Sequence, residues 1–200
     1  MKRRSLLAAL ALGPLVLGPL VLGLAPRRAW AIGGLLPELE QPAPDFELEG
    51  VAPGGKLLKA KAGSEALPIQ IALNQLAGRW LVLYFYPKDF TSGCTLEARG
   101  FQQDLAAFEA ESASVIGVSA DDLEAHASFC GSEGLVFPLL SDPGGVVSRR
   151  YGSWIAPYSQ RHTFLIDPQG ILRQRWTAVR PSGHSREVLA ELQRQKASII

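Results

Sequence analysis

The sequence predicts an α/β fold, a three-layer sandwich in which a central mixed β-sheet is flanked by helices. Three observations carry this prediction. Residues 80–132 alternate strand, helix, strand and helix, an order that joins parallel strands through helical crossovers. Residues 162–176 are predicted to form a β-hairpin, which adds antiparallel strands. Residues 185–196 form an amphipathic helix that packs on the sheet.

The first part of the chain carries the weaker signals. Residues 32–44 are predicted to be irregular, and residues 45–48 alternate as a short strand does. Residues 50–70 contain Gly, Pro and Lys without clear periodicity, so we expect a loop or an irregular hairpin. A short element follows at 71–76. The apolar and aromatic run at 80–86 has the length and composition of a strand buried on both faces.

The middle of the chain gives clearer patterns. Residues 94–110 repeat apolar side chains at steps of three and four, which is typical of an amphipathic helix. Residues 114–120, SVIGVSA, are predicted to be a second buried strand, and 123–132 a second helix. Asp122 precedes this helix as a capping residue, and Gly134 closes it.

The last third supplies the hairpin and the final helix. Residues 137–142 are predicted to be a short extended piece, and 144–151 a helical turn or short helix. A strand at 162–167 turns through Pro-Gln-Gly and returns at 171–176. The helix at 185–196 ends the fold.

Residues 1–31 are predicted to be a secretory signal peptide that resembles a twin-arginine export signal. The basic start MKRR is followed by an uncharged apolar stretch and by an Ala-x-Ala cleavage pattern at Ala29 and Ala31. An uncleaved membrane anchor is the alternative, because about twenty apolar residues can span a bilayer. We therefore expect an exported domain over residues 32–200, in a periplasm or a thylakoid lumen.

The charge pattern gives no support for nucleic-acid binding. The formal net charge is +1, and no basic cluster is interleaved with aromatic residues. Without residues 1–31 the chain has 15 basic and 19 acidic residues, so the mature domain is mildly acidic. His126, His162 and His184 are scattered without the spacing of metal ligands. We expect no metal and no other cofactor.

The stretch YPKDFTSGC places a thiol, Cys94, where a strand stops and a helix starts. Unpaired N–H groups and the dipole at a helix start stabilise a thiolate. Pro87 ends the strand, Gly93 lets the backbone approach closely, and Thr91 supplies a hydroxyl three residues before the thiol. The residues alone leave two interpretations open, a reactive thiolate or a buried cysteine that the helix tolerates.

The longer segment YFYPKDFTSGCTLEARGFQ resembles the active site of the peroxiredoxins, closest to their bacterioferritin-comigratory or peroxiredoxin Q branch. Pro87, Thr91 and Cys94 meet the family pattern P-x-x-x-T-x-x-C. PAPDFEL, FPLLSDPGGVVSRRYG and RHTFLIDPQGIL resemble further blocks of the family in the same order, so the resemblance covers residues 37–195. It implies a thioredoxin-like fold and a thiol-dependent peroxidase that reduces hydrogen peroxide and alkyl hydroperoxides.

The resemblance also implies a role for each matched residue. Cys94 is the peroxidatic nucleophile, which becomes a sulfenic acid. Thr91 hydrogen-bonds the peroxide and the thiolate, and Pro87 shields the sulfur from water. Arg161 faces the sulfur and stabilises the thiolate and the departing oxygen, with a surface salt bridge as the alternative. Glu97, in the family's C-T-x-E stretch, helps to hold Arg161, unless it is a surface charge of the helix.

The second cysteine has two interpretations. Many members of the branch place a resolving cysteine five residues after the first, where this chain has Arg99. HASFCGSEG resembles members that carry it in the second helix, which implies that Cys130 resolves the sulfenic acid in an atypical two-cysteine cycle. Both helices must then unfold locally for the thiols to meet. Alternatively, Cys130 packs in the core with Leu123 and Ala127, and the enzyme works with one cysteine.

The resemblance implies thioredoxin or a similar thiol reductant as partner, and a monomer. Two rival activities of the same fold fit less well. A thioredoxin-type oxidoreductase needs a second cysteine separated from the first by two residues of the chain, and a copper-delivery protein needs paired cysteines and a distant His. Cys94 has no such neighbour. A non-enzymatic exported domain with a structural Cys94–Cys130 disulfide stays open.

Overall fold

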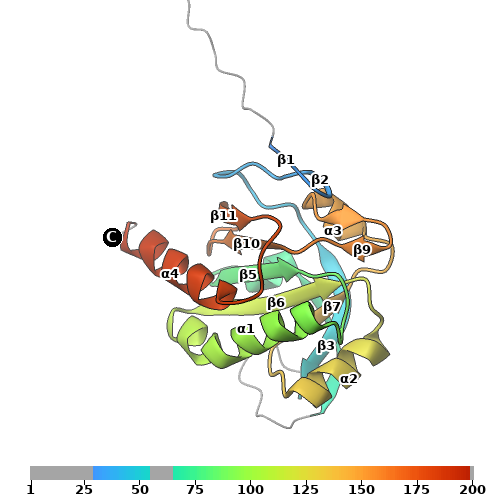
Figure 1. Ribbon diagram of the computed structural model, residues 1–200. Helices are drawn as coiled ribbons and strands as arrows, with labels where there is room; N and C mark the ends of the chain where they lie inside the picture. The colour runs from blue at the N-terminus through green and yellow to red at the C-terminus, as the bar shows by residue number, and fades with distance from the viewer. Residues whose placement is uncertain (1–28, 55–64, 199–200) are drawn as a thin grey trace, which may run out of the picture.

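A computed structural model describes residues 29–54 and 65–198, and its centre is a seven-stranded mixed sheet (Figure 1). From edge to edge the strands are β11 (Leu172–Trp176), β10 (His162–Ile166), β5 (Trp80–Phe85), β6 (Ala113–Ser119), β7 (Leu139–Ser141), β3 (Glu47–Pro53) and β4 (Ala66–Ala72). The strands β5, β6 and β7 are parallel, and the other neighbouring pairs are antiparallel. The predicted mixed sheet is confirmed.

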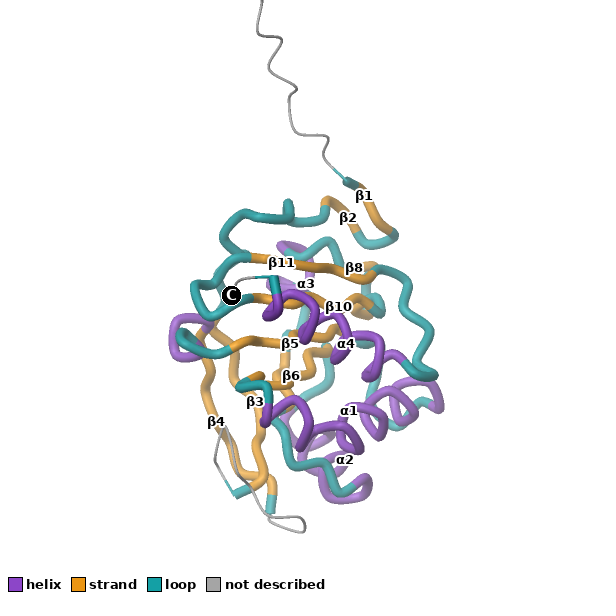
Figure 2. Tube along the Cα trace, turned by 90° about the vertical axis from the view of Figure 1, so that its left-hand side faces the viewer, coloured by secondary structure: helices purple, strands orange, loops and turns teal. Residues whose placement is uncertain are grey.

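Helices cover both faces of this sheet. They are α1 (Ser92–Ala110), α2 (Leu123–Glu133), α3 (Val146–Arg150) and α4 (His184–Ala197), with a short 3₁₀ helix, η1 (Leu73–Leu76). One hydrophobic core lies between the sheet and α1, α2 and α4, which lie on the same face (Figures 1 and 2). A second core on the opposite face includes residues of α3 and η1. The predicted three-layer, thioredoxin-like sandwich is confirmed.

The strand β5 shows why its sequence is apolar throughout. All six of its residues are buried. Val82 and Tyr84 point into the core beneath α1, whereas Leu81 and Leu83 point into the core on the other face. Because successive side chains of a strand alternate between faces, a strand covered on both sides has no polar position. The end of β5 is thereby fixed as the rigid platform from which the loop to α1 departs.

Residues 50–54 and 65–70 are more regular than the sequence indicated. β3 and β4 form a regular antiparallel hairpin, with Glu47 opposite Ala72 and Pro53 opposite Ala66. Residues 55–64, inside this predicted loop, lie outside the described residues. The periodicity of β4 is weak because it is an edge strand, where exposed side chains and Pro68 are tolerated.

Two small hairpins went unpredicted. β1 (Trp30–Ala31) pairs with β2 (Gly34–Leu35) inside a region that was expected to be irregular. β8 (Trp154–Ile155) pairs with β9 (Tyr158–Ser159) just before β10. Strands of two residues carry no readable alternation, so only the structure reveals them. The second hairpin leads the chain into Arg161.

The predicted signal peptide falls almost wholly on residues 1–28, which lie outside the described residues, and it stays a prediction. Within residues 29–54 and 65–198 no helix has the length and apolar composition needed to span a membrane.

Candidate active site

The first turn of α1 carries Cys94 as its third residue, with 1% of its surface exposed. β5 ends at Phe85, and the half-buried Pro87 opens the loop that leads to Thr91, the residue before the helix. Thr91 has an extended backbone, and its carbonyl accepts the N–H of Thr95 at 2.9 Å. A helix that begins in this way presents unpaired N–H groups, which stabilise negative charge near the sulfur.

Arg161 is brought to this sulfur by strand pairing. His162 lies opposite Phe85, so the residue before β10 lies beside the end of β5. The Nη2 of Arg161 donates to the Sγ of Cys94 at 3.3 Å. Gly93 makes room for the guanidinium, since a Cβ there would lie 3.2 Å from Nη2. The Arg161 side chain is 15% exposed, so the structure brings the predicted pair together and the alternative of a surface salt bridge is wrong.

Glu97, one turn after Cys94, holds the other arm of the guanidinium. The Nη1 of Arg161 donates to Oε2 at 2.5 Å, and Oε1 has no hydrogen-bond partner among the described residues. Burial raises the pKa of Glu97 to about 7, although Arg161 opposes this shift. Burial alone would lower the pKa of Arg161, but Glu97 and Cys94 outweigh it and the pKa is raised. The guanidinium therefore stays charged beside the sulfur.

Glu97→Gln is expected to change how stability depends on pH. The folded protein keeps the Glu97 proton up to about pH 7, whereas the usual pKa is 4.5. The stabilisation from this proton is complete below pH 4.5 and is lost as the pH rises through 7. Relative to Glu97→Gln, the free energy of unfolding of the wild type should fall by about 1–3 kcal/mol over this range.

Urea unfolding of the two reduced proteins at a series of pH values measures this difference. Glu109→Gln, on the exposed side of the same helix, is the control variant. A stability difference between the two proteins that does not change with pH would contradict the burial of an ionisable Glu97 proton. A wild type that gains stability relative to Glu97→Gln as the pH rises would contradict it as well.

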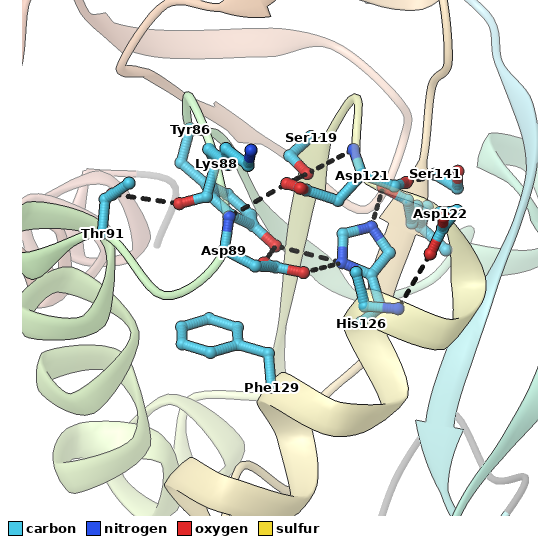
Figure 3. A network of polar contacts seen from close by, with 12 residues as sticks. Tyr86, Lys88, Asp89, Thr91, Ser119, Asp121, Asp122, His126, Phe129 and Ser141 are labelled. Carbon is cyan, nitrogen blue, oxygen red and sulfur yellow. Dashed lines mark hydrogen bonds and ion pairs between the residues drawn. The ribbon is translucent and has the colours of Figure 1, made fainter.

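Thr91 and Pro87 lie in the loop before Cys94 as predicted, but the Thr91 hydroxyl does not donate to the sulfur. The Thr91 hydroxyl donates to the main-chain oxygen of Lys88 at 3.0 Å (Figure 3). The expected donation from Thr91 to the thiolate is therefore not present in this structure, because the Lys88 carbonyl within the loop takes the proton. A contact of Thr91 with a peroxide, and the shielding role of Pro87, stay predictions.

Cys130 lies in α2 with 2% of its surface exposed, and both cysteines are free thiols. Burial and then the Asp89 carboxylate raise the pKa of Cys130 to about 12. The two sulfurs thus have opposite neighbours, a guanidinium at Cys94 and a carboxylate near Cys130. Only the first kind of neighbour stabilises a thiolate. Both residues belong to the core beneath the helices, so the predicted core position of Cys130 is also present.

Two cavities of the described residues lie beside this centre. One of about 400 Å³ lies at the opposite end of β5 and is lined by residues such as Asn74, Arg79 and Asp167. A cavity of about 300 Å³ between α1 and α4 includes Leu96 and Pro181 and adjoins the Cys94 turn. No group of three or more His, Cys, Asp or Glu side chains within residues 29–54 and 65–198 is arranged to hold a metal ion.

Comparison with known proteins decides the family. The sequence model of the AhpC/TSA family matches residues 39–175. Peroxiredoxin Bcp of Xanthomonas campestris is 37% identical over 163 residues, which cover 77% of this chain and 93% of the relative. Peroxiredoxin Bcp of Bacillus subtilis is 35% identical over 163 residues, which cover 78% and 94%. The chain belongs to the AhpC/TSA family.

Solved structures agree with this assignment. Xanthomonas campestris peroxiredoxin Q matches with a TM-score of 0.61 at 34% identity, covering 72% of this chain and 89% of that one. The predicted bacterioferritin-comigratory and peroxiredoxin Q branch is confirmed, and with it a thiol-dependent peroxidase. Peroxiredoxins act on peroxides with a thiol reductant, which accounts for a cysteine set beside a buried arginine.

A buried network of polar side chains in this peroxiredoxin was not predicted. Asp89, in the loop before Cys94, contacts both Tyr86 and His126 (Figure 3). The sequence contained one usable signal, since His126 lies four residues before Cys130 and therefore on the same side of α2. The sequence shows His126 only as one of three scattered histidines, because its partner Asp89 lies 37 residues away.

Proposed function

We propose that this peroxiredoxin reduces hydrogen peroxide and alkyl hydroperoxides through Cys94 and then closes a Cys94–Cys130 disulfide. The observation that carries the first half is the Arg161 guanidinium, which bridges the Cys94 sulfur and Glu97. Fixed donors of this kind stabilise charge that develops on the attacked peroxide without reorganising during the reaction. Glu97 keeps the fork of donors aimed at the sulfur.

The first step oxidises Cys94. The thiolate attacks one oxygen of the hydroperoxide, the S–O bond forms as the O–O bond breaks, and the leaving oxygen takes a proton and departs as water or alcohol. The sulfur loses two electrons and becomes a sulfenic acid. In the second step the Cys130 thiolate attacks this sulfur, the disulfide forms, and hydroxide leaves as water.

The spacing of the two cysteines supports the second step. Two solved structures of the Xanthomonas peroxiredoxin Q carry Cys-to-Ser substitutions at positions thirty-six residues apart. Cys94 and Cys130 have the same separation. Both thiols lie in intact helices, and disulfide formation in this cycle proceeds by local unfolding of at least one of them so that the two Cα atoms reach disulfide distance.

The proposed substrate class and the proposed thiol reductant are based on similar proteins. One solved structure, 32% identical with a TM-score of 0.62, is described as addressing alkyl peroxide reduction by the Xanthomonas bacterioferritin comigratory protein. Phe90 and Leu96 lie close to Cys94 in the sequence, and their exposed side chains suit an apolar substituent on the peroxide. We assign thioredoxin or a similar dithiol as the reductant, and a monomer as the working form.

We also propose export, on the basis of the predicted signal over residues 1–31. The reductant must then be present in a periplasm or a thylakoid lumen. N-terminal sequencing of the protein recovered from its producing cell is expected to begin at residue 32, and a chain that retains the apolar stretch would overturn this proposal.

Cys130→Ser tests the proposed cycle. With thioredoxin, thioredoxin reductase and NADPH, wild type should turn over hydrogen peroxide and cumene hydroperoxide. Cys130→Ser should lose at least about tenfold in turnover while Cys94 still reacts once. Ala127→Ser, one turn earlier on α2, is the matched control.

Two outcomes would overturn the cycle. Full turnover by Cys130→Ser would leave a one-cysteine peroxidase. A wild type that is already disulfide-bonded and indifferent to peroxide would leave a structural disulfide.

A further inference from the structure

The loop that leads into α1 is joined to α2 by a buried pair of polar side chains. Asp89 lies in this loop, and His126 lies on α2 one turn before Cys130. Asp89 Oδ2 and His126 Nδ1 are 2.8 Å apart, and the two side chains are 1% and 0% exposed. The reaction of Cys94 with peroxide uses neither of them.

All polar side-chain atoms of this pair have partners (Figure 3). The Leu140 carbonyl lies 3.2 Å from His126 Nε2 and can only accept, so Nε2 donates to it, while Nδ1 is hydrogen-bonded to Asp89 Oδ2. Asp89 Oδ1 accepts the Tyr86 hydroxyl at 2.7 Å, and the Asp89 N–H donates to Asp121 Oδ2 at 2.9 Å. A buried network that is satisfied in this way fixes the loop rigidly against α2.

The neighbouring residue of the loop adds a contact and stores strain. The Phe90 ring packs edge-on against Phe129 of α2, with centroids 5.1 Å apart. Phe90 has a φ of 60°, in the left-handed region that is costly for a residue with a side chain. The loop is therefore held in a strained conformation by its contacts with α2, and opening it releases that strain.

A second ion pair joins the two cysteine-bearing segments, but it is exposed to solvent, whereas the Asp89–His126 pair is buried. Arg99 of α1 donates to Glu133 of α2 at 2.6 Å, but the Arg99 side chain is 65% exposed. Exposed ion pairs contribute little to stability, whereas breaking a buried pair is strongly destabilising. Asp89 and His126 are therefore the stronger tie.

We propose that Asp89 and His126 form a latch that sets how fast Cys130 reaches the oxidised Cys94. This proposal rests on the proposed function, in which Cys130 resolves the sulfenic acid. α1 packs mainly on α4 and β6, and α2 mainly on β3, β7 and β4. The two cysteine-bearing helices are therefore held by different neighbours, and the latch opposes movement of either segment out of its place.

Opening the latch removes two obstacles to the second step. It frees α2 from the loop, and it takes the Asp89 carboxylate away from Cys130, whose pKa burial and this carboxylate raise to about 12. The thiolate is the attacking form, so both changes speed disulfide closure. A closed latch prolongs the sulfenic acid, which a second peroxide converts to sulfinic acid. The latch thereby sets the balance between disulfide formation and overoxidation.

Asp89→Asn and His126→Gln, each in the full chain, test the latch. Each should close the disulfide at least about tenfold faster than wild type, as expected for the loss of a charged hydrogen bond. Rapid quench and intact mass after one equivalent of hydrogen peroxide measure this rate. The rate of Cys94 oxidation should stay within about threefold, because neither residue contacts the sulfur. At excess peroxide the sulfinic fraction should fall.

Further variants distinguish a specific effect of the Asp89–His126 contact from a general loss of fold stability. Arg99→Ala is the matched control, because it removes the exposed tie and should change closure by less than about threefold. Tyr86→Phe removes one neutral hydrogen-bond partner of Asp89 and leaves the Asp89–His126 contact in place. This variant should speed disulfide closure by about threefold, and it gives a test even if a charge variant fails to fold. Asp89→Asn combined with His126→Gln should close no faster than the faster single variant, since both break one contact.

Closure at or below the wild-type rate in the folded variants would overturn the latch, and so would an equal effect of Arg99→Ala. Hydrogen exchange of the reduced wild type gives an independent readout. Amides of residues 86–91 and of α2 should open together with one free energy, and independent opening would overturn the latch even if the disulfide forms. A wild type that forms no disulfide while both segments open together contradicts the resolving role of Cys130 instead.

Discussion

Replacing Cys94 with Ser is expected to lower the rate of reaction with hydrogen peroxide by at least about 10³-fold, which is the largest effect in this protein. A hydroxyl in the first turn of α1 does not ionise near neutral pH, and it has no sulfur to carry the oxygen. The near-isosteric change keeps the volume of this buried position, so the fold should persist. Rapid mixing with peroxide, followed by intact mass, measures the rate.

Cys130→Ser is the matched control for this loss, since it removes the other buried thiol of the same core. Cys130→Ser should keep the fast first oxidation. Equal reaction rates in wild type and Cys94→Ser would show that the peroxide-reactive sulfur is not the one beside Arg161.

The second largest effect is expected for Arg161→Lys, which should slow oxidation of Cys94 by about 10²-fold to 10³-fold. Arg161 uses two arms of one planar group, Nη2 on the Cys94 sulfur and Nη1 on Glu97. A lysine ammonium keeps the charge but has no rigid fork, so it cannot hold both partners in this geometry. Second-order rates under pseudo-first-order peroxide give the comparison.

Arg173→Lys is the control for Arg161→Lys. Arg173 also holds a buried carboxylate, that of Asp167, but it does so beyond the opposite end of β5. Its substitution should leave the peroxide rate within about twofold. If Arg161→Lys reacts at the wild-type rate, charge alone activates the sulfur and the bridging geometry has no catalytic role.

The elements that sequence reasoning predicted well are those with a strong local pattern. The β5 run is apolar throughout because both faces of the sheet are covered, and α1 shows the spacing of a helix buried on one side. The edge strand β4 and the small β8–β9 hairpin have short or exposed stretches. Their formation depends on pairing with distant segments rather than on local periodicity.

Some features of the candidate site were likewise predictable from the sequence, and others were not. Cys94, Thr91 and Pro87 form one contiguous motif, and Arg161 was placed only through the resemblance of a second block. The direction of the Thr91 hydroxyl was not predictable, because it depends on which acceptor the folded loop brings nearest.

The Asp89–His126 contact lay beyond sequence reasoning for a related reason. It joins residues 37 positions apart, and the helical spacing that puts His126 on the same side of α2 as Cys130 does not point to Asp89 as its partner. Sequence patterns report on local periodicity, whereas buried polar pairs are selected by the packing of whole elements. The same limit applies to the electrostatic contrast between Cys94 and Cys130, which only the folded chain displays.

The central claim is that Cys94 is oxidised by peroxide and then resolved by Cys130 within one chain. The most direct test is the intact mass of reduced wild type and Cys130→Ser after one equivalent of hydrogen peroxide. A loss of about 2 Da in wild type and a gain of about 16 Da in Cys130→Ser is the predicted result, from disulfide and sulfenic acid chemistry respectively. A wild type that gains oxygen and never loses two hydrogens would contradict the resolving role of Cys130, and an unchanged mass in both proteins would contradict the peroxidase itself.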